Sequence, residues 1–124
     1  MKQILYHLVP EYIYKKSINK LGNYNCKGFE DSNFIHTTVG LKEMKRIGDL
    51  LYTNTMKSER PDASGRFYEK PSVKFVLLTI NKLKVKARMG LVKGKFYHIY
   101  GSLPRNSYNV KKVKRDKKGR FILK

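Results

Sequence analysis

Three histidines are the residues of this 124-residue chain whose type and setting could support chemistry. Each lies in a short apolar segment typical of a β-strand: His7 in YHL, His36 in IHT and His98 in YHI. An imidazole can bind a metal or act as acid or base near neutral pH. A histidine on a strand is more often a hydrogen-bonded structural group, but three in strands and none in loops is a less ordinary pattern. The three are therefore candidate catalytic residues.

Neither a metal centre nor a cysteine nucleophile is indicated. The histidines are 29 and 62 residues apart, which is not a metal-ligand spacing. The single cysteine, Cys26, excludes a disulfide framework and a cysteine-based zinc site, and its polar surroundings carry no nucleophile motif. We expect no metal cofactor.

Positive charge is concentrated in the second half of the chain. The net charge is +19, of which residues 1–69 carry +3 and residues 70–124 carry +16, with Asp116 as the only acid in the latter. Such asymmetry favours a polyanionic partner, and residues 70–124 could bind nucleic acid. The alternative is that the excess reflects an AT-rich genome, because 21 of the 28 basic residues are lysine and only 7 are arginine.

The hydrophobic pattern predicts an α+β domain with an antiparallel sheet and two helices in the N-terminal half. The first helix should begin at Pro10 and end near Leu21–Gly22. The second should cover about Val39–Asn54, capped by Thr37 or Thr38, with its lysines and aspartate facing solvent. An extended mobile loop is expected at about residues 56–72. The predicted strands are Gln3–Val9, Asn33–Thr38, Val73–Ile80 (central), Val85–Ala87, Phe96–Tyr100, and a hairpin of Tyr108–Val113 with Phe121–Leu123.

The chain is expected to be one intracellular domain covering residues 1–124. No repeat or linker divides it. Gly90 and Gly94, which follow the predicted strand at Val85–Ala87, indicate a loop interrupted by glycines. No apolar run approaches 18 residues, and the first residues do not form a secretory signal. We therefore expect no membrane insertion.

Three motifs in order along the chain resemble the family of unknown function numbered 952. They are YHLVP at residues 6–10, FIHTT at residues 34–38 and FYHIYGSL at residues 96–103, and the resemblance covers the whole chain. Two positions depart from the family pattern: Asn33 stands where glycine is usual, and Tyr97 where proline is usual. The strand before the third motif also lacks the glutamate that the family usually carries there.

This resemblance implies an ADP-ribosyltransferase-like fold, a small split antiparallel sheet around a cleft that binds NAD in active relatives. By position, His7 would hold a ribose hydroxyl, His36 would shape the nicotinamide pocket, and His98 or Tyr100 would occupy the third motif's place. Tyr6 and Tyr100 are candidate ligand-binding residues because their hydroxyls can reach a cleft, and Thr37 in the second motif is a further candidate.

The missing glutamate argues against the commonest reaction of such folds. An oxocarbenium-like transition state is cationic and needs a carboxylate beside it, yet residues 70–115 contain no acid. The related RNA 2′-phosphotransferases instead use histidine and arginine to hold phosphates and NAD. Arg88 and Arg105, which flank the third motif, could clamp phosphate, or each could be a solvated surface charge.

Three functions remain open from the sequence. The first is binding of NAD, a phosphorylated nucleotide or an RNA end in a histidine-lined cleft. If the protein with such a cleft is an enzyme, it would be a glycosyltransferase or phosphotransferase that acts with NAD. The second is a non-catalytic basic protein that binds nucleic acid. The third is a small structural protein whose lysines only maintain solubility.

Overall fold

The structure is a computed structural model that describes residues 4–25, 34–53 and 65–123. These residues form an α+β fold, which confirms the predicted class and the position of both helices in the N-terminal half. The elements are β1 (Ile4–Pro10), α1 (Glu11–Ser17), β2 (Ile35–Thr38), α2 (Leu41–Tyr52), β3 (Phe75–Asn81), β4 (Arg88–Val92), β5 (Phe96–Tyr100), β6 (Tyr108–Arg115), β7 (Phe121–Ile122) and 3₁₀ turns at Lys82–Lys84 and Arg105–Ser107.

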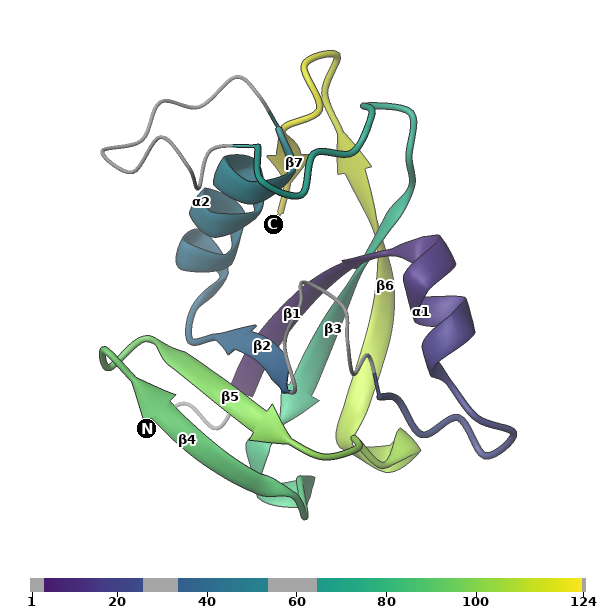
Figure 1. The fold of residues 1–124 in the computed structure, drawn as a ribbon, viewed down its shortest axis with the longest axis vertical. Helices are drawn as coiled ribbons and strands as arrows, with labels where there is room; N and C mark the ends of the chain where they lie inside the picture. The colour runs from purple at the N-terminus through teal and green to yellow at the C-terminus, as the bar shows by residue number, and fades with distance from the viewer. Residues whose placement is uncertain (1–3, 26–33, 54–64, 124) are drawn as a thin grey trace.

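The strands form one antiparallel sheet in the order β4-β5-β2-β1-β3-β6-β7 (Figure 1). Strand β3 lies between β1 and β6, as its nearly continuous apolar sequence predicts, since a strand buried on both faces needs no polar alternation. Strands β6 and β7 form the predicted hairpin around the turn at Gly119.

The sheet divides between β1 and β2. Strand β1 pairs with β3 along its whole length, and β2 pairs with β5 at all four of its residues. Between β1 and β2 there is a single register pair, Tyr6 with Thr38, beyond which the two strands diverge (Figure 1). The result is a small part, β4-β5-β2, set at an angle to a larger part, β1-β3-β6-β7.

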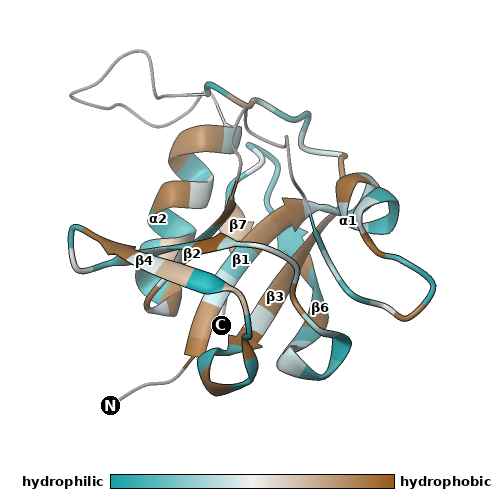
Figure 2. Cartoon of the chain, turned by 60° about the horizontal axis from the view of Figure 1, so that its bottom comes forward, coloured by the Kyte–Doolittle hydropathy of each residue, from teal (hydrophilic) through white to brown (hydrophobic). Residues whose placement is uncertain are grey.

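Two hydrophobic clusters lie on opposite faces of the sheet, because successive side chains of a strand point to opposite sides. Strands β1 and β3 contribute to both clusters, and Figure 2 shows hydrophobic residues along them and on α2. Helix α2 packs very closely on β1 at Gly48, where a Cβ atom would come within 2.6 Å of Leu8 Cδ2. Glycine at this position therefore sets the distance between helix and sheet.

Both predicted helices are longer than the observed ones. Helix α1 ends at Ser17 rather than near residue 21, because the side chain of Asn19 accepts hydrogen bonds from the backbone amides of Leu21 and Asn23 and forms a turn. Helix α2 begins at Leu41, and the predicted threonine cap is wrong. Gly40 occupies the N-cap position with a φ of 95°, a value that favours glycine.

One polar residue of α2, Asp49, faces the protein interior and not solvent, so the prediction for it is wrong. Its side chain is buried. The carboxylate accepts a hydrogen bond from the backbone N–H of Phe121 at 2.7 Å and forms an ion pair with Lys45. These bonds join α2 to β7. The periodicity of charged residues did not reveal them, because the partner is a backbone amide far away in the sequence.

The strand after β3 also differs from the prediction. Residues 85–87 are not a strand; the strand is β4, at residues 88–92, in the segment predicted as a loop broken by Gly90. Gly90 pairs with His98 inside the sheet, and only Gly94, with a φ of 69°, lies in the turn.

The loop predicted at about residues 56–72 lies partly outside the described residues, from 56 to 64. In the described part, the backbone amides of Gly65, Phe67 and Glu69 donate hydrogen bonds to carbonyls at the C-terminal end of α2. This part of the loop is therefore attached to the helix, which fixes the position of Arg66 relative to it.

Candidate functional site

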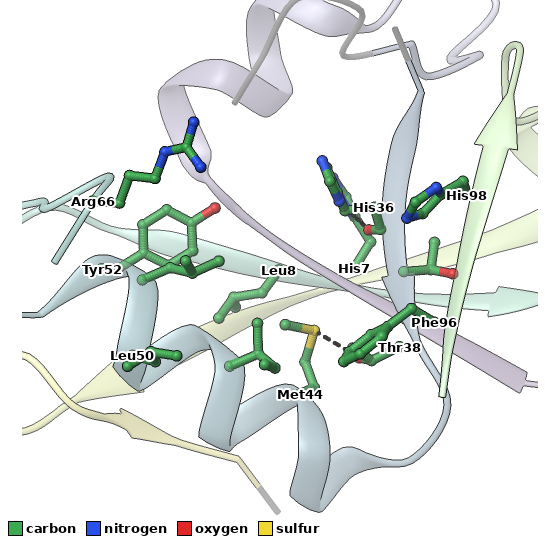
Figure 3. Close-up of a pocket in the computed structure, with 13 residues that line it drawn as sticks. His7, Leu8, His36, Thr38, Met44, Leu50, Tyr52, Arg66, Phe96 and His98 are labelled. Atoms are coloured by element: carbon green, nitrogen blue, oxygen red, sulfur yellow. Dashed lines mark hydrogen bonds between the residues drawn. The ribbon is translucent and has the colours of Figure 1, made fainter. Parts of the chain in front are cut away.

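A cleft of about 300 Å³ lies where β1 and β2 diverge, and α2 closes one side of it (Figure 3). The sheet side carries the three histidines and two threonines, and the helix side is apolar. The lining residues are His7, Leu8, His36, Thr37, Thr38, Met44, Ile47, Leu50, Leu51, Tyr52, Arg66, Phe96 and His98. The cleft is thus built by the split in the sheet and by the apolar face of one helix.

His7 bridges the two strands at the point where their pairing stops. Its Nδ1 lies 2.6 Å from the backbone oxygen of His36, and its Nε2 lies 2.7 Å from the hydroxyl of Tyr24. A carbonyl oxygen only accepts, so Nδ1 carries the proton and Nε2 accepts from the Tyr24 hydroxyl. Burial lowers the pKa of His7 to about 4, so the ring is neutral at neutral pH. With both nitrogens bonded, His7 is best understood as a positioning residue.

His36 and His98 face each other across β2 and β5. They are register partners, their ring centroids are 5.5 Å apart, and the rings are nearly perpendicular. Burial, followed by the neighbouring His98, lowers the pKa of His36 to about 4, and burial also lowers the pKa of His98. Both imidazoles are therefore neutral at neutral pH, and each can donate at one nitrogen and accept at the other.

His98 is the imidazole best placed to contact a ligand. Its ring stacks on Phe34 with centroids 3.8 Å apart, which fixes its orientation. Within the described part of the chain, its ring nitrogens make no hydrogen bond to the protein. A neutral donor and acceptor that faces a cleft and is held by stacking suits a hydroxyl or amide group.

The opposite side of the cleft carries an apolar wall and one cation. Figure 3 shows Met44 and Leu50 on α2 at one side, and Arg66 across the cleft from His98. Arg66 is exposed, and its guanidinium lies over the ring of Phe67, 5.2 Å from the centroid. It forms no ion pair with any described residue. An apolar wall, neutral polar groups and a cation that no described residue neutralises together suit a flat ring that carries an anionic group.

The structure brings together four of the eight residues predicted for the site. His7, His36, His98 and Thr37 line the cleft, although the Thr37 hydroxyl is buried and donates to the backbone oxygen of Tyr97 at 2.9 Å. Tyr6 lies elsewhere, in a separate groove that it shares with Thr79 and Asn109 of the larger part of the sheet.

The other three predicted residues lie outside the cleft lining. Tyr100 is at the end of β5, in ring contact with His98, and Arg88 lies over the Tyr100 ring. Arg105 is at a distant 3₁₀ turn, where its Nη1 donates to the backbone oxygen of Tyr108 and its guanidinium lies over the same residue's ring. Arg105 is thus engaged in a structural role.

Sequence reasoning missed two residues that shape the site. Tyr24 lies between the predicted first helix and the strand predicted at Asn33, where the sequence pattern predicts no element. It is nevertheless fully buried, paired with Leu103 through both backbone amides, and bonded to His7. Arg66 lies in the predicted mobile loop, where no periodicity or motif distinguishes it. The sequence also does not predict the helix side of the cleft. The spacing of Met44, Leu50 and their neighbours indicates that they are buried, but not that they line a cleft.

Two general features concern cofactors and membranes. Among the described residues, no group of three or more histidine, cysteine, aspartate or glutamate side chains is arranged to hold a metal ion. Cys26 lies outside those residues. No helix in the described ranges has the length and apolar character needed to cross a bilayer.

Comparisons with known proteins support the fold alone. No protein-family profile matches the sequence, and no curated protein matches it. Protein CC0527 from Caulobacter crescentus, known from its crystal structure, is similar in fold, with a TM-score of 0.62 and 13% sequence identity over 96% of this chain and 93% of that chain. A double mutant of CC0527 gives the same values. At this identity the similarity concerns the architecture and not the chemistry.

Proposed function

We propose that the cleft binds a phosphorylated nucleotide, either NAD or a nucleic-acid end. The observation that carries this proposal is the combination of neutral His98, an apolar wall and Arg66 in one cleft. Among the described residues, Arg66 has no ion-pair partner and the cleft lining has no acidic side chain. A phosphate needs cations and hydrogen-bond donors, and a carboxylate nearby would repel it.

Each wall suits a different part of such a ligand. The apolar side chains of α2 and the ring of Phe96 can enclose a flat heterocycle, while His98 can hydrogen-bond to a sugar hydroxyl or an amide. Arg66 can reach a phosphate at the mouth. The cleft volume of about 300 Å³ is at the lower end of the range for small-molecule sites, which suits one ring and its sugar with the phosphate outside.

The split sheet around this cleft agrees with the ADP-ribosyltransferase-like arrangement that the sequence motifs suggest, and this likeness is part of the proposal. Glutamate-dependent ADP-ribosyl transfer is not included, because no carboxylate of the described lining could stabilise a cationic sugar. A transferase built on this site would use Arg66 to hold phosphate and a neutral imidazole to accept a proton.

Titration calorimetry with NAD, ADP-ribose and a 2′-phosphorylated RNA oligonucleotide tests the proposal. We expect at least one of them to bind, and Arg66→Ala and His98→Ala each to weaken that binding about tenfold, the value of one hydrogen bond to a charged group. Lys114→Ala, which removes one positive charge from the distant strand β6, is the matched control and should leave affinity unchanged.

Two results would contradict the proposal. One is the absence of binding by all three ligands. The other is an equal loss of affinity in Arg66→Ala and in Lys114→Ala, because that would show attraction to the overall positive charge and not binding in the cleft.

A further inference from the structure

Two of the arginines in the described residues stand apart from the rest. Four have partners: Arg46 with Glu43, Arg105 and Arg115 with backbone carbonyls, and Arg120 with Asp116. Arg66 and Arg88 form no hydrogen bond or ion pair with any residue that the structure describes. Arg66 lines the cleft, and Arg88 is connected to it through a series of ring contacts. An arginine held in place without an anionic partner is a candidate for binding an external anion.

The ring contacts lead from the cleft to Arg88 along one face of the small part of the sheet. His98 stacks on Phe34, and Phe34 contacts Tyr100 with centroids 5.5 Å apart. Arg88 and Tyr100 are register partners, and the Arg88 guanidinium carbon lies 4.4 Å from the centroid of the tyrosine ring. A guanidinium held against a ring by this cation–π contact keeps its N–H donors around its rim, where they can bind a phosphate.

In the sequence, Arg88 is preceded by a row of cations, the lysines at residues 82, 84 and 86. Lys84 and Lys86 are exposed, and neither has an ion-pair partner in the described ranges. Lys84 lines the groove that also contains Tyr6, so Lys86 is the cation next to Arg88. Lys82, the next in the row, is engaged, because its Nζ donates to the hydroxyl of Tyr97 at 2.8 Å. Since residues 70–115 contain no acid, nothing in this segment neutralises the row. Successive cations suit a ligand with repeated phosphates.

We propose that the cleft takes the end of a single-stranded nucleic acid, with Arg88 as its second phosphate-binding group. This inference rests on the proposed function of the cleft. The terminal nucleotide occupies the cleft, the next base lies against the part of the Tyr100 ring that Arg88 leaves exposed, and the following phosphates meet Arg88 and Lys86. Aromatic rings beside a basic track are the usual means of binding single strands without reading their sequence. A free dinucleotide has one pyrophosphate and supplies no further phosphates for the row.

Fluorescence anisotropy with a labelled RNA hexanucleotide, and calorimetry with NAD, test this inference on the full chain. We expect Arg88→Ala to weaken hexanucleotide binding about tenfold, to reduce the slope of log affinity against log salt by about one, and to leave NAD affinity unchanged. Tyr100→Ala should weaken hexanucleotide binding as well, while Tyr100→Phe, which keeps the ring, should not. Lys114→Ala is again the control for the loss of one charge.

The outcomes separate this inference from the proposed function. If the hexanucleotide binds and Arg88→Ala changes its affinity no more than Lys114→Ala does, the second phosphate position is wrong, while the cleft proposal stands on its own variants. If Arg88→Ala weakens NAD as much as the hexanucleotide, the ligand is a free dinucleotide and the nucleic-acid assignment is overturned. If no nucleotide binds at all, both proposals fail together.

Discussion

Acid should destabilise the folded protein through His7. The ring is buried, neutral and bonded at both nitrogens, so a proton can enter only if the bond from the Tyr24 hydroxyl to Nε2 is broken. Burial lowers the pKa of His7 from 6.5 to about 4 in the folded state. Between these two values the unfolded chain binds a proton at this residue and the folded chain does not. The free energy of unfolding therefore falls as the pH is lowered through this interval.

The expected size follows from the same pKa difference. Each pH unit in the interval costs about 1.4 kcal/mol for one such group, so His7 accounts for a loss of about 3 kcal/mol between pH 6.5 and pH 4. His36, whose pKa is also lowered to about 4, adds a loss in the same direction. The acidic residues with lowered pKa values, Glu43 and Asp116, contribute only toward the acid end of this range.

Urea unfolding at a series of pH values, on the wild type and on His7→Gln, isolates the contribution of His7. The substitution itself costs stability at every pH, because glutamine cannot reproduce both hydrogen bonds. The informative quantity is the slope of unfolding free energy against pH, which should be smaller in His7→Gln by about 1.4 kcal/mol per pH unit. Contributions of Glu43 and Asp116 cancel in the comparison, because neither carboxylate is among the causes of the lowered His7 pKa.

Equal slopes in the two proteins between pH 6.5 and pH 4 would refute this reasoning. NMR titration of the imidazole nitrogens provides an independent reading: the His7 resonances should show Nδ1 protonated and Nε2 unprotonated at neutral pH. A His7 signal that titrates near pH 6.5 in the folded protein would show that the ring is not buried as described.

Two further expectations concern the packing around α2. Replacing Arg115 by methionine removes guanidinium hydrogen bonds to the carbonyls of residues 69, 70, 73 and 119 and the contacts with the rings of Phe75 and Phe121. We expect a loss of about 2–3 kcal/mol in urea unfolding, because these are hydrogen bonds of a charged group that is half-buried. A loss below about 1 kcal/mol would show the group to be solvated. Gly48→Ala should lower stability by about 1–3 kcal/mol despite the better helix propensity of alanine, because its Cβ would meet Leu8, and a stabilised variant in thermal unfolding would contradict the close packing.

The elements that could be predicted are those whose pattern depends on burial alone. The central strand, here β3, is continuous in apolar residues, and β5 was predicted with its exact bounds because turn residues flank it on both sides. Strand β4 is not predicted, because a glycine within a short apolar segment indicates a break. In the sheet, Gly90 lies opposite His98 and close to the Tyr100 ring, where a small residue is accommodated. Sequence spacing does not show such a cross-strand neighbour.

The site was predictable on the sheet side and not on the helix side. The three histidines share strand segments with strong apolar neighbours, and that pattern led to them. Tyr24 and Arg66 belong to segments without regular structure, and their positions depend on long-range backbone bonds, those of Tyr24 with Leu103 and those of residues 65–69 with the end of α2. Local propensity carries no information on contacts of this kind.

The position of β1 in the sheet has a consequence for how the protein is made. Among the described strands, β1 comes first in the sequence but lies in the middle of the sheet. Its long partner β3 is complete only at Asn81, which pairs with Ile4. At translation rates of about 5–20 residues per second, the apolar side chains of β1 wait several seconds for that partner. During this time Leu5, Leu8 and Val9 have no sheet to join, so this short segment is where a ribosome-bound chain most needs protection by a chaperone.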